Sequence, residues 1–142
     1  MAFLRPEDQE AVRKEFERIQ GPVKLVVFSQ ELTAGELCRQ NEQLMREVAE
    51  LDPRITVEVL NPSIDRERAE VYGVDQVPAI VVEGARDYGI RFLGIPSGYE
   101  FTNLIDSIIV ASSGQPDLSA ETRTALAGLA SEVDIKVFST PT

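Results

Sequence analysis

Residues 77–93 read VPAIVVEGARDYGIRFL. The apolar and largely β-branched run 79–82 is typical of a buried strand, and we interpret 88–93 as a second strand. Gly84 lies in the short connection between them, so the two runs predict a β-hairpin. Pro78 directly precedes the first strand, a position where its missing N–H costs no ladder hydrogen bond. The rest of the fold can be assembled outward from this hairpin.

Two strands and three helices are predicted before the hairpin. Val23–Phe28 is a short apolar run with one lysine, which favours a largely buried strand. Residues 55–59 alternate between apolar and polar side chains, the period of a half-buried strand. The helices are predicted at 6–20, ending before Gly21-Pro22, at 33–50, and at 64–72, with Gly73 as its C-cap.

The helix at 33–50 has a specific predicted start and face. Thr33 and Glu36 have the spacing of a capping box in which Thr33 is the N-cap. The inner face is predicted as an apolar stripe, with Cys38 and Met45 beside it. The stripe consists of Leu37, Asn41, Leu44, Val48 and Leu51.

After the hairpin, a helix over about 98–111 closes the unit, with Phe101, Leu104, Ile105 and Ile108 on its inner face. A linker at 112–116 is followed by a predicted helix at 119–130 and a predicted strand at 133–138. A parallel βαβ unit joined to a hairpin and a closing helix gives an α/β fold. Its four-stranded mixed sheet is flanked by helices.

The last helix and strand repeat the first ones. VKLVVFS at 23–29 matches VDIKVFS at 133–139 at an offset of 110, and Phe16 and Ile19 match Leu126 and Leu129. Chance similarity between short strands is the alternative, but the helix in the same phase favours a tandem duplication. We therefore divide the chain into a complete unit, 1–117, and the first helix and strand of a truncated second unit, 118–142.

The predicted strand at 133–138 needs a partner for its backbone N–H and C=O groups. We expect it either to add to an edge of the first unit's sheet or to form a homodimer by pairing with the same strand of a second molecule. The preceding helix is expected to pack on the first unit through Leu126 and Leu129.

Composition excludes several classes of function. The 142 residues carry a net charge of −10, which disfavours binding to nucleic acid or to anionic membranes. The chain has no histidine, which removes the Ser-His-Asp triad and most zinc sites, and no motif calls for a cofactor or a metal. There is no apolar run of bilayer length and no secretory signal pattern, so we expect a cytoplasmic protein.

The order of elements resembles that of the thioredoxin fold with an added N-terminal helix. Val77-Pro78 stands where that fold has its cis-proline, and residues 88–101, YGIRFLGIPSGYEF, resemble the corresponding run of the tandem glutaredoxin-like protein disulfide oxidoreductases. The ending 137–142 resembles the strand and loop that lead into the Cys-x-x-Cys of their second unit. The N-terminal domain of the alkyl hydroperoxide reductase flavoprotein is a related possibility.

The chain departs from this family at the redox motif. The resemblance implies a Cys-x-x-Cys at the start of the helix after the first strand, but the chain has one cysteine, Cys38. Cys38 corresponds to the second cysteine if a small gap is allowed, which puts Gly35 in the place of the attacking thiol. Without a gap, the repeat puts Thr33 there. In both alignments the attacking thiolate is missing, so no dithiol exchange is expected from this chain alone.

The resemblance implies a redox-inactive half of a protein disulfide oxidoreductase, acting as a scaffold or a peptide-binding module. Val77, Pro78 and the loop 30–35 would line the peptide groove, and protein or peptide thiols and disulfides would be the partners of the parent protein. One alternative is a monothiol oxidoreductase that uses Cys38, and another is a structural or dimerisation domain. The sequence leaves open the substrate, the redox partner, the oligomeric state and whether Cys38 is reactive or a core residue.

Overall fold

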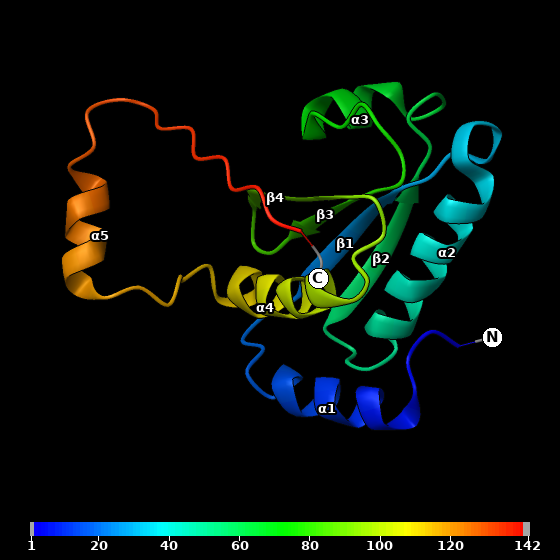
Figure 1. Cartoon of the computed structure of the whole chain (residues 1–142), viewed down its shortest axis with the longest axis horizontal. Helices are drawn as coiled ribbons and strands as arrows, with labels where there is room; N and C mark the ends of the chain where they lie inside the picture. Colours follow the sequence, from blue (N-terminus) through cyan, green and yellow to red (C-terminus); the bar gives the residue numbers. More distant parts are fainter. Residues whose placement is uncertain (1, 141–142) are drawn as a thin grey trace.

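The computed structural model describes residues 2–140 (Figure 1). The strands are β1 (Val23–Phe28), β2 (Ile55–Leu60), β3 (Ala79–Glu83) and β4 (Asp87–Leu93). They form one sheet in the order β2-β1-β3-β4. β1 pairs in parallel with β2 and antiparallel with β3, and β3 pairs antiparallel with β4. The structure therefore contains the four-stranded mixed sheet and the hairpin that the sequence predicts.

Helices cover both faces of the sheet. The helices are α1 (Pro6–Phe16), α2 (Glu31–Ala49), α3 (Arg66–Tyr72), α4 (Tyr99–Ser113) and α5 (Ala120–Ala127). α1, α2 and α4 pack with one face in the larger core, whereas α3 covers the other face with a smaller one (Figure 1). Within residues 2–140, no helix is long and apolar enough to span a bilayer.

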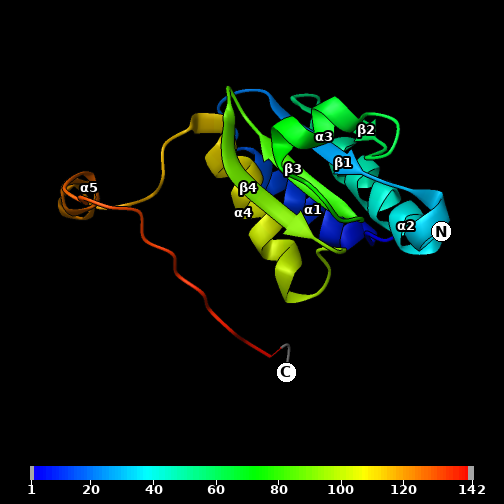
Figure 2. The same ribbon diagram turned by 90° about the horizontal axis from the view of Figure 1, so that it is seen from above.

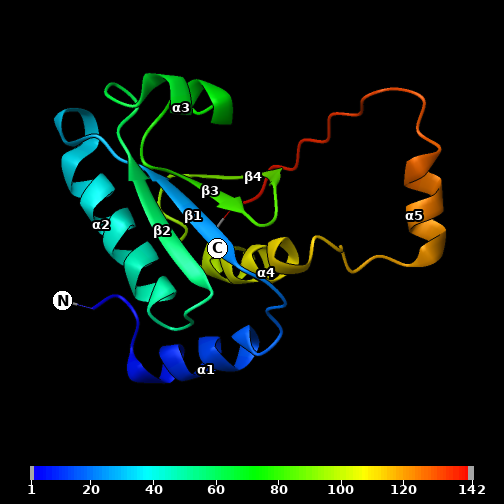
Figure 3. The ribbon, with the colours of Figure 1, turned by 180° about the vertical axis from the view of Figure 1, so that it is seen from behind.

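β1 supplies both cores because successive strand residues point to opposite faces of the sheet. Leu25 and Val27 lie in the larger core, and Val26 and Phe28 lie in the smaller one. All four side chains are fully buried, because β1 lies between β2 and β3 and helices cover both faces of the sheet there (Figure 3). This explains why the run is almost continuously apolar instead of alternating.

α1 ends at Phe16, four residues before the predicted end, and its C-terminal end is held by Arg54. Pro6 occupies the first turn, where its missing N–H costs no hydrogen bond. The Arg54 guanidinium donates to the carbonyl oxygens of Phe16 (3.0 Å) and Ile19 (2.7 Å) and to the buried carboxylate of Asp52 (2.6 Å). Hydrogen bonds from Arg54 lower the pKa of Asp52, although burial opposes the shift. Arg54, 38 positions from Phe16 in sequence, thus adds a second donor to the Phe16 carbonyl, which also accepts from the N–H of Ile19, and supplies a donor to the Ile19 carbonyl.

The predicted capping box of α2 is wrong. The helix begins at Glu31 with Gln30 as its N-cap, and Ala34 (φ −148°, ψ 47°) interrupts the first turns. The Thr33 hydroxyl donates to Oε1 of Gln30. The Glu36 carboxylate accepts from Gln40 one turn later, so neither side chain makes the reciprocal bonds of a box.

The inner face of α2 also differs from the predicted stripe at its start. Leu37 is 52% exposed, whereas Cys38 is fully buried. The helix turns by about 100° per residue, so a face centred on Cys38 leaves Leu37 at the edge. The buried positions of the helix are Cys38, Asn41, Leu44, Met45 and Val48.

The C-terminal region lies apart from the sheet (Figures 1 and 2). α5 has no buried residue, and Leu126 and Leu129 are 51% and 55% exposed, so the predicted packing of this helix on the first unit is wrong. Residues 133–138 are extended but form no strand and do not add to an edge of the sheet. The reason is that a strand exists only through pairing, and no strand within residues 2–140 lies beside this segment. Residues 141–142 of the expected second unit lie outside the described range.

Candidate functional site

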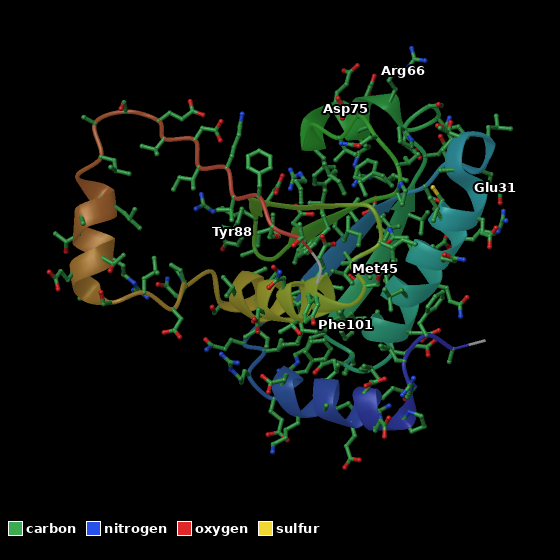
Figure 4. All side chains as sticks on the ribbon, viewed as in Figure 1. Glu31, Met45, Arg66, Asp75, Tyr88 and Phe101 are labelled. Carbon is green, nitrogen blue, oxygen red and sulfur yellow. The ribbon has the colours of Figure 1, made fainter. Side chains whose placement is uncertain are left out.

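One end of the sheet brings together an end of each of its four strands. The register pairs Phe28 with Leu60 on one side and with Ala79 on the other, and it pairs Ala79 with Leu93. The carboxyl ends of β1, β2 and β4 and the start of β3 therefore lie in one row. α2 begins from the same end, where Figure 4 marks its first turn by Glu31. The predicted site residues are thus brought to one end of the fold from separate parts of the sequence.

Cys38 lies inside this end of the molecule. Its side chain is fully buried, and its Sγ accepts a hydrogen bond from the backbone N–H of Gln30 at 3.4 Å. The thiol is free, as the chain holds no second cysteine. Dithiol exchange needs an accessible attacking thiolate and a second thiol that resolves the mixed disulfide. The arrangement around Cys38 provides neither in the folded chain.

The resemblance seen in the sequence puts Gly35 or Thr33 in the place of an attacking thiol, and neither side chain carries sulfur. Gly35 begins the uninterrupted part of α2, after the irregular Ala34, and Thr33 lies exposed in the turn before it. The residue that organises this loop is Gln30, which sequence reasoning did not single out. In addition to its bonds with Thr33 and Cys38, its Nε2 donates to Oγ of Ser63 at 2.6 Å. The only signal in the sequence is its position two residues after β1.

The peptide bond between Val77 and Pro78 is cis, the geometry expected from the sequence. Pro78 is buried, and its carbonyl accepts from the N–H of Gly94 at 2.8 Å, which ties it to the end of β4. Val77 is half-buried, and within residues 2–140 its N–H and C=O make no hydrogen bond. Backbone groups in this state can pair with an added extended chain.

Large apolar side chains are exposed around this end. Leu32 in the first turn of α2 is 96% exposed, Ile64 in the loop after β2 is 80% exposed, and Leu93 at the end of β4 is 55% exposed. Together with Val77, they border this end of the sheet from four separate segments of the chain. These residues would offer apolar contacts to a chain paired with the Val77 backbone.

Asn41 lies one helical turn beyond Cys38 and is also fully buried. Neither its Oδ1 nor its Nδ2 has a hydrogen-bond partner within the described residues. Leaving a buried amide unpaired costs stability, typically about 1–3 kcal/mol. Sequence reasoning assigned Asn41 to the inner stripe but did not detect this unsatisfied amide, because partners are visible only in the folded structure.

A group of charged side chains covers the part of the sheet that α3 leaves open. Glu58 forms ion pairs with Arg68 (2.6 Å) and Lys24 (3.1 Å), and hydrogen bonds from these two residues lower its pKa. The Tyr72 hydroxyl donates to Glu83 at 2.8 Å, and burial is the largest cause that raises the pKa of Tyr72. These side chains are engaged with one another, which favours a structural role. Within residues 2–140, no three acidic or cysteine side chains are grouped so as to hold a metal ion.

No known family profile and no curated protein matches the sequence. The fold is similar to that of a mutant of the alkylhydroperoxide reductase AhpF from Enterococcus faecalis V583, with a TM-score of 0.80 and 24% identity. That match covers 89% of this chain and 61% of the other. The crystal structure of the NTD_N/C domain of the same enzyme gives a TM-score of 0.74 and 22% identity, covering 86% of this chain and 59% of that one.

A protein disulfide oxidoreductase from Aeropyrum pernix K1 is similar as well, with a TM-score of 0.77 and 23% identity over 91% of this chain and 56% of the other. The chain thus spans about three fifths of these proteins. At such identities the likeness establishes the fold. It agrees with the mixed four-stranded sheet, the flanking helices and the resemblance seen in the sequence. The chain therefore has a thioredoxin-like fold.

Proposed function

We propose that this chain is a redox-inactive thioredoxin-like half of a protein disulfide oxidoreductase. In this proposal it acts as a scaffold or a peptide-binding module, and thiol–disulfide exchange takes place elsewhere in the parent protein. Residues 118–142 would be the first helix and strand of a second unit. We also propose a cytoplasmic location, which suits a single free cysteine.

One observation supports the proposal that the chain has no dithiol–disulfide activity. Cys38 is the one cysteine in the chain, and its side chain is fully buried. A thiolate attack followed by resolution needs two thiols, one of them accessible. Thr33 and Gly35, the two candidates for the place of the first thiol, have no nucleophilic sulfur.

The peptide-binding role is supported by the backbone at Val77. An extended peptide that pairs with its free N–H and C=O would gain main-chain hydrogen bonds, as in other modes of strand addition. Leu32 and Leu93 would contact apolar side chains of that peptide. Such binding requires no chemistry at Cys38, so it is compatible with the buried thiol.

Insulin reduction in the presence of dithiothreitol tests the loss of redox activity. The chain and its Cys38→Ser variant are expected to give the same rate as dithiothreitol alone. Alkylation of Cys38 at neutral pH is expected to be slow in the native chain and fast in denaturant, because the thiol is buried. A rate clearly above the variant, or fast native alkylation, would overturn the proposal and favour a monothiol enzyme that uses Cys38.

Nuclear magnetic resonance titration with extended, apolar, cysteine-free peptides tests the binding site. We expect shifts at the amide of Val77 and in the loop 30–35, and loss of binding in Val77→Asp. Val110→Asp is the matched control, because Val110 lies near the other end of the sheet and is 37% exposed. Equal effects of the two variants, or no shifts at any peptide concentration, would leave only the scaffold role.

A further inference from the structure

A groove with an apolar floor is lined by residues of both α1 and α4, which lie side by side (Figure 1). Val12 and Ile105 in the floor are 6% and 5% exposed, and the partly buried Phe101 packs against the same core (Figure 4). Ala11 also lines the groove, and its small side chain leaves space above the floor. We call this feature the α1–α4 groove.

The rim of the α1–α4 groove is acidic. Asp8 and Glu15 lie exposed on α1, and Asp106 lies exposed on α4. Asp106 has no hydrogen-bond or ion-pair partner within residues 2–140, and Asp8 accepts only from the backbone N–H of Arg5. Glu15 pairs with Arg18 at 3.2 Å, an exposed contact that compensates one of the three charges. No lysine or arginine lines the groove, so its rim carries uncompensated negative charge.

The groove suits a helix better than an extended peptide. The backbone groups of α1 and α4 are bonded within each helix, so the groove offers no free strand edge for pairing. A helical ligand satisfies its own backbone groups, and its ridges of side chains can fill the space between two neighbouring helices. We propose that the α1–α4 groove binds a cationic amphipathic helix of a partner protein. The apolar ridge of that helix would lie on the floor, and its lysine or arginine side chains would face the rim.

Charge selects this occupant over the alternatives. α4 contains Glu100 and Asp106 and no basic residue, and the whole chain has a net charge of −10. A second copy of the chain or an anionic membrane would therefore be repelled from the rim, whereas a cationic helix would be attracted. The groove runs along the first half of α4, and α5 and the residues after it lie apart from it (Figure 2).

Fluorescence anisotropy of a labelled peptide tests the proposal with the full chain. The probe is a helical peptide of about 18 residues, with leucine along one side and lysine elsewhere. We expect saturable binding between about 1 µM and 1 mM protein, weakened as added salt screens the rim charges. A peptide with glutamate in place of lysine is expected not to bind. Amide shifts in nuclear magnetic resonance spectra are expected at Ala11 and Ile105 and not at Val77, which separates this surface from the proposed peptide site.

Two variants test the floor and the rim separately. Ala11→Leu fills the groove without changing the charge and is expected to weaken binding about tenfold. Asp106→Lys reverses the charge of the unpaired rim carboxylate and is expected to weaken it about fivefold or more. Glu10→Lys is the matched control, because it changes the net charge equally but lies about 200° around α1 from Asp8. It is expected to change binding less than about twofold. All three positions are exposed, so circular dichroism is expected to be unchanged.

Four results would overturn the proposal. The first is no saturable binding of the lysine peptide, and the second is equal binding of the glutamate peptide. The third is an equal loss of binding in Glu10→Lys and Asp106→Lys, which would show attraction by net charge without a defined groove. The fourth is a dimer of the native chain that Ala11→Leu abolishes in sedimentation, which would assign the groove to a second copy.

Discussion

Phe16 in α1 and Leu126 in α5 occupy equivalent places in the sequence repeat, and they are 1% and 51% exposed. Val27 in β1 is fully buried, whereas its counterpart Val137 is 85% exposed. The two regions have nearly the same apolar pattern and opposite surroundings. The pattern therefore fixes which side of an element can be buried, and neighbouring elements decide whether it is.

The neighbours of the first copy are identifiable. β1 lies between β2 and β3, and Arg54 ties the end of α1 to the loop before β2. α5 has an N-cap, since Ser119 accepts from the N–H of Thr122, but it has no packing partner. Local signals were thus sufficient to form the helix of the second copy and insufficient to bury it.

The largest expected effect comes from truncating equivalent core positions in the two copies. Phe16→Ala should lower the free energy of unfolding by about 3–5 kcal/mol, because it leaves a cavity between α1 and the sheet. Leu126→Ala should change it by less than about 0.5 kcal/mol, as expected for an exposed side chain. Urea unfolding of the dilute monomer measures both. Similar losses would show that α5 is packed on the folded unit.

A smaller loss is expected from removing the arginine that ties α1 to its neighbours. Arg54→Ala removes the guanidinium donors to the carbonyls of Phe16 and Ile19 and to the buried Asp52 carboxylate, which keeps the backbone N–H of residue 54. Arg123→Ala is the control, because Arg123 donates to the Pro116 carbonyl in the exposed second copy. The melting temperature should fall clearly in the first variant and stay nearly constant in the second. Equal melting temperatures would contradict the role of Arg54.

The ion pair between Arg54 and Asp52 should also make the stability of the folded unit depend on pH. The pKa of Asp52 is lowered in the folded chain, so its ionised form stabilises the fold above the ordinary carboxyl pKa of about 4. This contribution is lost as the pH falls through the lowered value. In Arg54→Ala the pKa of Asp52 should rise, and unfolding measured between pH 7 and pH 2 should become less pH-dependent. An unchanged profile would assign the acid sensitivity to other carboxyls.

The smallest effect is expected from deleting residues 118–142. Because α5 has no buried residue and residues 133–138 are exposed, the free energy of unfolding of the dilute chain should change by less than about 0.5 kcal/mol. The deletion should also abolish any dimer that is built on residues 133–138. Urea unfolding and sedimentation check the two results, and a clear loss of monomer stability would show that the second copy supports the first.

Most elements of the fold could be predicted because their signals are local. The run 23–28 contains only one polar residue, and the structure has a strand with those bounds. Gly73 has φ 65°, a conformation that favours glycine, so it ends α3 as predicted. The position of Val77-Pro78 before the hairpin was also recognisable. Each of these depends on neighbours in sequence or on a conformation that few residues adopt.

Part of the candidate site could not be predicted because its contacts are not local. Thr33 and Glu36 have the spacing of a capping box, but Gln30 binds Thr33, Cys38 and Ser63 and starts the helix earlier. The bond to Ser63 joins two loops that are separated by α2 and β2. No spacing rule in the sequence contains it.

The amino-acid sequence alone was sufficient to establish the absence of a cysteine pair, the buried character of β1 and the order of helices and strands as far as α4. The three-dimensional structure was needed to see that Cys38 is inaccessible, that Asn41 is buried without a partner among residues 2–140 and that the second copy of the repeat is exposed. The physical reason is that side-chain chemistry and helix or turn preferences are set within a few residues of the chain. Burial and strand pairing depend on which distant segments are present to make the contact.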